Sequence, residues 1–387
     1  MHPAAQPPHL HHPPVPPWPR RARKVGAPLA VLIGLGAVTG LLIILLTLTN
    51  PVGAAIGFAL STVAIAVVVL SYLWLDRWEP EPPRLLHLAF IWGASLAIVV
   101  SLIVELWFDS AFAPVAGLPE GFESTAIRAP LIEEAAKGLF LLVMMTGRRR
   151  NELNSLTDCL VYAGLVGAGF AWLEDILYIA NGESVAGSLL TAALRLVMAP
   201  FAHSLFTTFT GIGVYFALKQ RTAIAKVACI GLGYVAAVLM HMLWNGSSLL
   251  GIGTYFAVYA LWMVPIFTLA IALGVYSRKR EQRIVAEKLP GMVSAGLITA
   301  NEASWLGSIR TRKQAIAEVT RHSGKQDGKA VRDFAAQVVE LAFVRDRIDR
   351  GFGDARVQAL LHEEAYWVHA ARASAPALGW LTHYRVH

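Results

Sequence analysis

Charged residues and cysteines are both scarce in this sequence. Only 15% of the 387 residues are Asp, Glu, Lys or Arg, whereas 56% are hydrophobic. Soluble domains carry about 25% charged residues, so the composition excludes an ordinary soluble protein and favours a polytopic membrane protein. The two cysteines, Cys159 and Cys229, lie in or beside apolar segments. They exclude a disulfide framework, and we expect free thiols rather than zinc ligands.

The net charge of +7 does not point to nucleic acid. The Lys and Arg residues lie in short loops between apolar segments and in the C-terminal region. Positively charged loops on the cytoplasmic side of a membrane protein explain this distribution better than a nucleic-acid surface does. We therefore expect membrane lipid, and no nucleic acid, around this chain.

Apolar runs dominate the middle of the chain. About eight of them approach the ~20 residues that a membrane-spanning helix requires. The basic loops alternate with loops that are short or acidic, and Arg148-Arg149-Arg150 and Arg278-Lys279-Arg280 fall on the same side. This pattern predicts an all-α, multi-pass bundle in the cell membrane with both termini in the cytoplasm. The expected spans are 28–49, 51–75, 87–108, 128–146, 156–180, 190–218, 226–246 and 253–277.

Composition divides the chain into three regions. Residues 1–27 are rich in Pro and His and end in a basic cluster, so we expect a disordered cytoplasmic head. Residues 28–277 form the expected transmembrane helical domain. Residues 278–387 are polar and basic with helical periodicity, and we expect a small cytoplasmic helical domain. Leu289-Pro290-Gly291 and the segment 323–328 are predicted to break it into pieces.

One expected span contains three charged residues in its interior. Glu133, Glu134 and Lys137 interrupt the apolar run 128–146. Each such charge costs about 2.5–3.5 kcal/mol near the centre of a spanning helix, so intramembrane charges are usually functional. The rest of the chain must therefore supply partners at the same depth.

The next three expected spans supply such partners. Glu174 lies about six residues from the outer end of its span, and His241 about five residues from the outer end of its own. Glu133 lies about five residues from the outer end of its span, and His203 is somewhat deeper. With a rise of about 1.5 Å per residue, these side chains share one layer in the outer leaflet. Asn245 follows His241 by one helical turn and lies on the same face.

This combination of residue types suits metal-assisted hydrolysis. Two imidazoles and a carboxylate match the ligands of a catalytic zinc ion, with a fourth position left for water. A remaining glutamate would then take the proton of that water as general base. Lys137 would neutralise a carboxylate, and Asn245 would orient a histidine or stabilise an oxyanion. A peptide bond in a membrane-anchored protein is the natural substrate.

Other interpretations remain open at this point. Each motif alone has an ordinary explanation, such as a solvated helix face or an interhelical hydrogen bond. An ion- or proton-coupled transporter would use the same buried charges as a relay, although the sequence shows no internal repeat. A catalytically silent scaffold is a third alternative. Established protease motifs fit less well, because no His-Glu-x-x-His occurs and Gly351-x-Gly353-Asp354 lies in the polar C-terminal region.

The motifs together resemble the PrsW family of intramembrane proteases, which is distantly similar to the CAAX-prenyl endopeptidase and bacteriocin-processing superfamily. The resemblance covers roughly residues 85–277. It rests on four elements in order along the chain: Glu133-Glu134-x-x-Lys137, Phe170-x-x-x-Glu174, His203 and His241-x-x-Trp244-Asn245.

The resemblance implies a membrane-embedded, metal-dependent protease, with zinc as the expected metal. It implies site-1 cleavage, on the extracytoplasmic side, of a single-span membrane protein such as an anti-sigma factor. Carried over by position, Glu133 or Glu134 acts as base, and Glu174, His203 and His241 hold the metal. Asp175 stands where the family pattern has Asn, which changes the hydrogen bonding expected beside Glu174.

Overall fold

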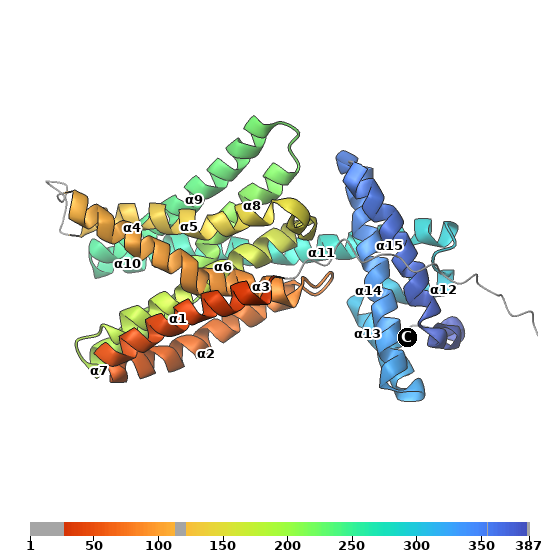
Figure 1. Ribbon diagram of the computed structural model, residues 1–387, viewed down its shortest axis with the longest axis horizontal. Coiled ribbons are helices and arrows are strands. Elements are labelled where there is room, and N and C mark those ends of the chain that lie inside the picture. Colours follow the sequence, from red (N-terminus) through yellow and green to blue (C-terminus); the bar gives the residue numbers. More distant parts are fainter. Residues whose placement is uncertain (1–26, 113–120, 354, 385–387) are drawn as a thin grey trace, which may run out of the picture. The chain divides into compact units, whose positions relative to one another are not determined.

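The computed structural model describes residues 27–112, 121–353 and 355–384 (Figure 1). Within these residues every regular element is a helix, which confirms the all-α prediction. The predicted head, residues 1–27, lies outside the described residues apart from Ala27.

The first helices are α1 (Leu29–Thr49), α2 (Pro51–Leu75), α3 (Pro83–Trp92), η1 (Gly93–Ala97), α4 (Ile98–Ala111), η2 (Glu123–Arg128), α5 (Ala129–Met144), η3 (Gly147–Glu152) and α6 (Leu156–Ala180). They are followed by α7 (Val185–Ala192), η4 (Ala193–Met198), α8 (Ala202–Leu218), α9 (Ala223–Leu249), α10 (Ile252–Val258), η5 (Tyr259–Met263) and α11 (Val264–Ser294).

Seven continuous helical segments in the described part are long and apolar enough to cross a membrane. They run over Leu29–Thr49, Pro51–Leu75, Pro83–Ala111, Leu156–Ala180, Val185–Leu218, Ala223–Leu249 and Ile252–Ser294. The remaining expected span, 128–146, corresponds to the continuous helix η2–α5, in which Glu133, Glu134 and Lys137 interrupt the apolar character. The chain is therefore a polytopic helical membrane protein, and the count of eight spans stays a prediction.

The first two spans are separated by a helix cap at Asn50. Its side chain accepts a hydrogen bond from the backbone N–H of Gly53 at 2.9 Å, and Pro51 occupies the first helical position of α2. Proline is favoured there because that N–H has no intrahelical partner. The amide of Asn50 also donates to the carbonyl of Ala180 at the end of α6. Asn50 thus ends α1, starts α2 and ties both to α6.

Helix α6 forms the centre of this bundle and is buried along nearly its whole length. Its glycines allow close approach of the neighbouring helices. A Cβ added at Gly169 would lie 1.8 Å from the carbonyl oxygen of Phe90 in α3. A Cβ added at Gly167 would lie 2.5 Å from the carbonyl oxygen of His203 in α8. Gly167 therefore sets the distance at which α8 presents His203.

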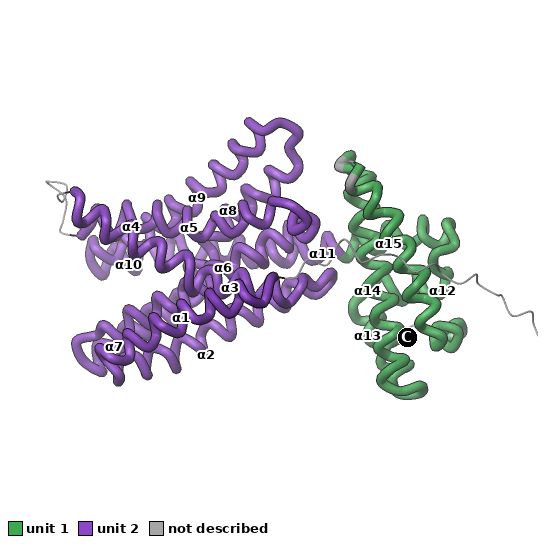
Figure 2. Tube along the Cα trace, viewed as in Figure 1, with its two compact units in different colours: residues 1–22, 282–387 green, residues 23–281 purple. Residues whose placement is uncertain are grey.

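The chain divides into two compact units, and the division falls between Glu281 and Gln282, inside α11 (Figure 2). The unit drawn in green, from Gln282 onward, contains α12 (Ala300–Leu306), α13 (Ile309–Ser323), α14 (Lys325–Arg347), η6 (Ile348–Phe352), α15 (Ala355–Ala373) and η7 (Pro376–His383). The predicted break near residues 323–328 is present, at Gly324 with φ of 93°. The predicted break at Leu289-Pro290-Gly291 is wrong, because α11 continues through Pro290 to Ser294. Leu289 and Met292 are both buried, so packing supports the helix across the proline.

Gly167→Ala should destabilise the transmembrane unit, because its Cβ would lie only 2.5–2.7 Å from backbone atoms of His203 and Ser204. Overpacking of this kind costs about 1–3 kcal/mol, and we expect a lower midpoint of thermal unfolding in detergent. Gly231→Ala on α9 is the matched control, since a Cβ there meets nothing within 4 Å. Equal midpoints for the two variants would contradict close α6–α8 packing.

Candidate active site

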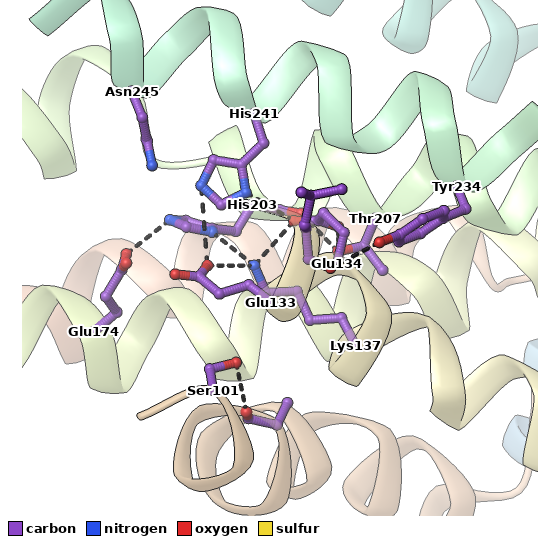
Figure 3. A network of polar contacts seen from close by, with 12 residues as sticks. Ser101, Glu133, Glu134, Lys137, Glu174, His203, Thr207, Tyr234, His241 and Asn245 are labelled. Carbon is purple, nitrogen blue, oxygen red and sulfur yellow. Dashed lines mark hydrogen bonds and ion pairs between the residues drawn. The ribbon is translucent and has the colours of Figure 1, made fainter. Parts of the chain in front are cut away.

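Lys137 lies at the centre of a cluster that joins α5, α8 and α9 (Figure 3). Its ammonium contacts Oε2 of Glu133 at 3.1 Å and Oε1 of Glu134 at 3.0 Å. These are contacts between residues four and three apart, which a single helix brings onto one face. The Lys137 side chain is fully buried, and its Nζ lies 3.7 Å from the centre of the Phe170 ring on α6. One cation therefore compensates two carboxylates inside the membrane.

His241 on α9 is held by the second glutamate. Its Nδ1 lies 3.1 Å from Oε1 of Glu134. A carboxylate only accepts hydrogen bonds, so Nδ1 carries the hydrogen and Nε2 keeps its lone pair in the neutral ring. That Nε2 is buried without a hydrogen-bond partner in the described part of the chain, 3.9 Å from Oε2 of Glu133. An imidazole lone pair thus faces a carboxylate oxygen across a short gap.

His203 on α8 is fixed from both sides. Its Nδ1 lies 3.1 Å from the ammonium of Lys137, and its Nε2 lies 2.8 Å from Oε2 of Glu174 on α6. Lysine donates and carboxylate accepts, so these partners select the neutral ring with its hydrogen on Nε2. Figure 3 shows His203 between Glu174 and the Glu133–Lys137 pair, with His241 above it. The ring centroids of the two histidines are 5.1 Å apart.

Arg195 adds a second cation to the cluster. It pairs with Glu174 and, through Nε at 2.5 Å, with Asp175. Asp175, the departure noted from the family pattern, therefore has a cationic partner. Arg195 lies in η4, a π-helical stretch of the kind that recurs at functional sites.

A cavity of about 420 Å³ adjoins this cluster. Glu133, Glu174 and Asn245 line it, together with Glu105 of α4 and Arg128 of η2. Asn245 donates one amide hydrogen to the carbonyl of Thr125 at 3.0 Å, which leaves its second amide hydrogen available. Glu134 does not line the cavity and is fully buried. We call this cavity the cleft.

Every residue in the predicted site belongs to this arrangement. Glu133, Glu134, Lys137, Glu174, His203 and His241 are linked by the contacts above, and Asn245 lies at the cleft beside them. Glu105 was missed, although it is the single charge in the apolar run Ile98–Trp107 and this signal was available. Arg195 was missed as well, and only its position in the fold reveals its contact with Glu174.

The donor set suits a metal ion. Ligand atoms of Glu133, His203 and His241 all lie within 4.8 Å of one another, and all three residues are buried. The unpartnered Nε2 of His241 is the kind of atom that a metal would satisfy. Two imidazoles and one carboxylate are the ligand types found in catalytic zinc sites.

The fold and the site together define a polytopic membrane protein with a buried carboxylate–imidazole centre of the type that activates water. Comparisons with known proteins agree. Residues 81–270 match the family described as PrsW family intramembrane metalloprotease. The chain is 30% identical over 225 residues to a protein named Protease PrsW from Oceanobacillus iheyensis, covering 56% of this chain and 93% of that protein. It is 31% identical over 166 residues to a Protease PrsW from Geobacillus kaustophilus, covering 42% of this chain and 67% of that protein.

The chain therefore belongs to the PrsW family of intramembrane metalloproteases. Family membership supports the predicted peptidase and leaves the transporter alternative without support. No solved structure matches the chain.

Lys137→Met should strongly destabilise the protein, because it removes the cation and leaves two carboxylates buried against each other. Breaking a buried ion pair from one side costs about 3–5 kcal/mol. Adding Glu134→Gln should recover part of this loss, since it removes one of the uncompensated charges. Thermal unfolding of the two single variants and the double variant in detergent measures this coupling. Strictly additive effects would show that Lys137 does not compensate Glu134.

Proposed function

We propose that this protein hydrolyses a peptide bond of a single-span membrane protein near the outer leaflet, and that an anti-sigma factor is such a substrate. The observation that carries the proposal is the pair formed by the bare Nε2 of His241 and Oε2 of Glu133, 3.9 Å apart beside the cleft. The choice of an anti-sigma factor as substrate is based on the resemblance of the chain to the PrsW family. If both termini are cytoplasmic, as the basic loops suggest, the cleft opens toward the outer leaflet.

In this proposal Glu133, Glu134 and Glu174 have three different roles. Glu133 reaches the cleft and is the base that removes a proton from the attacking water. Glu134 receives contacts from Lys137, His241 and Thr207 and holds the first two in place. Glu174 fixes the tautomer of His203 by accepting from its Nε2. Glu134 and Glu174 are thus positioning residues, because Glu134 does not line the cleft and Glu174, which does, is already paired with Arg195 and His203.

Asn245 is the candidate for oxyanion stabilisation. Its bond to the carbonyl of Thr125 fixes the amide plane at the edge of the cleft. The second amide hydrogen is then free to donate to the carbonyl oxygen of the scissile bond as negative charge develops there. A fixed donor of this kind contributes about 10²–10³-fold in rate in other proteases.

Glu133, His203 and His241 would hold the catalytic metal, which we take to be zinc. When bound, the metal supplies Lewis-acid polarisation and a lower pKa of its water. The sequence-based proposal used Glu174 as the carboxylate ligand. We now favour Oε2 of Glu133, which faces Nε2 of His241, because Glu174 is already paired with Arg195 and with Nε2 of His203. The other carboxylate oxygen of Glu133 would then act as the base. Lys137 faces the lone pair of Nδ1 of His203, so its ammonium and a metal compete for that nitrogen.

Glu133→Gln should lower kcat for a tagged single-span reporter by about 10²–10⁴, the usual contribution of a general base, with KM nearly unchanged. Glu134→Gln should be milder than Glu134→Ala, because the glutamine oxygen still accepts from His241. Cleavage is measured with purified protein in proteoliposomes, with membrane abundance checked for each variant. Glu183→Gln, in an exposed loop, is the control. Normal cleavage by Glu133→Gln would refute its assignment as base.

Metal content tests the ligand set independently of activity. A chain lacking residues 1–19 removes the N-terminal histidines, and we expect about one zinc per molecule. His203→Ala/His241→Ala should lose it, whereas Glu174→Gln should keep it if Glu133 is the carboxylate ligand. Lys137→Gln should bind zinc more tightly in a competition with a chelator, because the competing ammonium is gone. Loss of zinc in Glu174→Gln but not in Glu133→Gln would restore the sequence-based ligand set.

A further inference from the structure

A second cavity, of about 510 Å³, lies on the other side of α8 from the active site. Its lining comes from α2, α6, α8 and α11 and is mostly apolar, with Tyr72, Trp74, Phe201 and Phe267 as its aromatic residues. His203 and Thr207 of α8 face the active-site cluster, whereas Leu205 and Thr208 of the same helix line this cavity. We call it the α2–α11 groove.

The groove is open along its side. Val67, Leu70 and Ile271 line it, and they keep 57%, 63% and 53% of their surface exposed. All three lie within segments that are apolar enough to span the membrane, so the exposed side meets lipid chains rather than water. The volume lies within the range of pockets that bind one small organic ligand.

Two arginines lie at one end of this groove. The guanidinium of Arg278 lies 4.0 Å from the centre of the Trp74 ring, and Trp74 lines the groove. Arg77 is exposed in the turn two residues after Leu75, which also lines the groove. Neither guanidinium makes an ion pair or hydrogen bond within the described residues. Positive charge at the edge of an apolar groove is stabilised when an anion joins it.

The nearby carboxylates form no ion pair with either arginine in the described part of the chain, although the charge of Glu281 attracts Arg278. Asp76 is buried and accepts from the backbone N–H of Glu81 at 3.0 Å. Glu281 is buried and accepts from the hydroxyl of Ser155 at 3.1 Å. Both are therefore directed into the protein. The end of the groove combines an apolar channel, an aromatic ring and unpaired positive charge.

We propose that the α2–α11 groove binds one acyl chain of an anionic phospholipid whose headgroup lies between Arg77 and Arg278. The lipid comes from the leaflet at the end of the bundle that carries these arginines, which the positive-inside pattern makes the cytoplasmic one. Anionic lipids are enriched in that leaflet, and each nearby basic residue adds about 1 kcal/mol of attraction. The site is separate from the cleft and does not depend on the protease assignment.

Native mass spectrometry of the full chain tests the headgroup part, with phosphatidylglycerol and phosphatidylcholine of identical acyl chains as probes. We expect one phosphatidylglycerol per chain, bound at least about tenfold more tightly than phosphatidylcholine. Arg77→Gln/Arg278→Gln should bring the two lipids to within about twofold. The control Arg148→Gln/Arg221→Gln removes two exposed arginines from other loops and should keep the preference. A preserved preference in the first double variant, or an equal loss in the control, would overturn the proposal.

Filling the groove tests the acyl-chain part. Gly274 lines the groove, and a Cβ there would meet only Leu75 at 3.7 Å, an ordinary contact. Gly274→Leu should therefore fold with an unchanged unfolding midpoint and lose at least about tenfold in affinity for phosphatidylglycerol. Gly231→Leu, where nothing lies within 4 Å, is the control and should bind as the unmodified chain does. Unchanged binding by a folded Gly274→Leu variant would show that the lipid lies elsewhere.

Discussion

The rest of the transmembrane unit depends on the compensation of buried carboxylates by Lys137. Glu133 and Glu134 are adjacent in sequence and both buried, so without a cation their charges would repel each other in a medium that screens weakly. Lys137 is the only residue one turn away that carries the opposite charge. Its three short contacts, to both glutamates and to His203, use all the hydrogens of its ammonium. The histidines therefore take their orientation from an ion pair that α5 builds on its own.

The helical scaffold turns this local ion pair into a site. Helix α6 supplies Glu174 and also the glycines that let α3 and α8 approach it. Because Gly167 touches the backbone of His203 itself, the depth of that histidine relative to Glu174 is fixed by backbone contact rather than by a flexible side chain. Arg195 then anchors the far side of Glu174. Preorganisation of this kind keeps the groups in place before a substrate arrives.

Much of this arrangement was predictable from the sequence, because charged residues within membrane spans are rare and need polar partners at the same depth. Counting residues from the expected ends of four spans brought Glu133, Glu174, His203 and His241 into one layer, and the contacts agree. The partners of each atom were not predictable. Which glutamate holds His241, and which side of His203 faces Lys137, depend on rotations of helices about their axes. The depth of a residue along its helix does not determine how that helix is rotated about its axis.

The wrong prediction at Pro290 and the missed role of Arg195 also come from contacts that the local sequence does not reveal. Pro290 was expected to end a helix, but a proline penalty of about 3 kcal/mol can be offset where the residues on both sides are buried, as Leu289 and Met292 are. Arg195 was missed, because its counter-ions Glu174 and Asp175 lie on another helix, α6.

The position of the cleft explains why two glutamates are adjacent at this site. A carboxylate that holds two cationic or donor groups must stay buried, whereas a base must reach water and substrate. One side chain cannot meet both demands. Adjacent residues on a helix differ in direction by about 100°, so Glu134 faces the interior and Glu133 faces the cleft. Lys137, three and four residues further on, lies between these two directions and contacts both. The spacing of the motif is therefore the spacing that lets one cation serve an inner and an outer carboxylate.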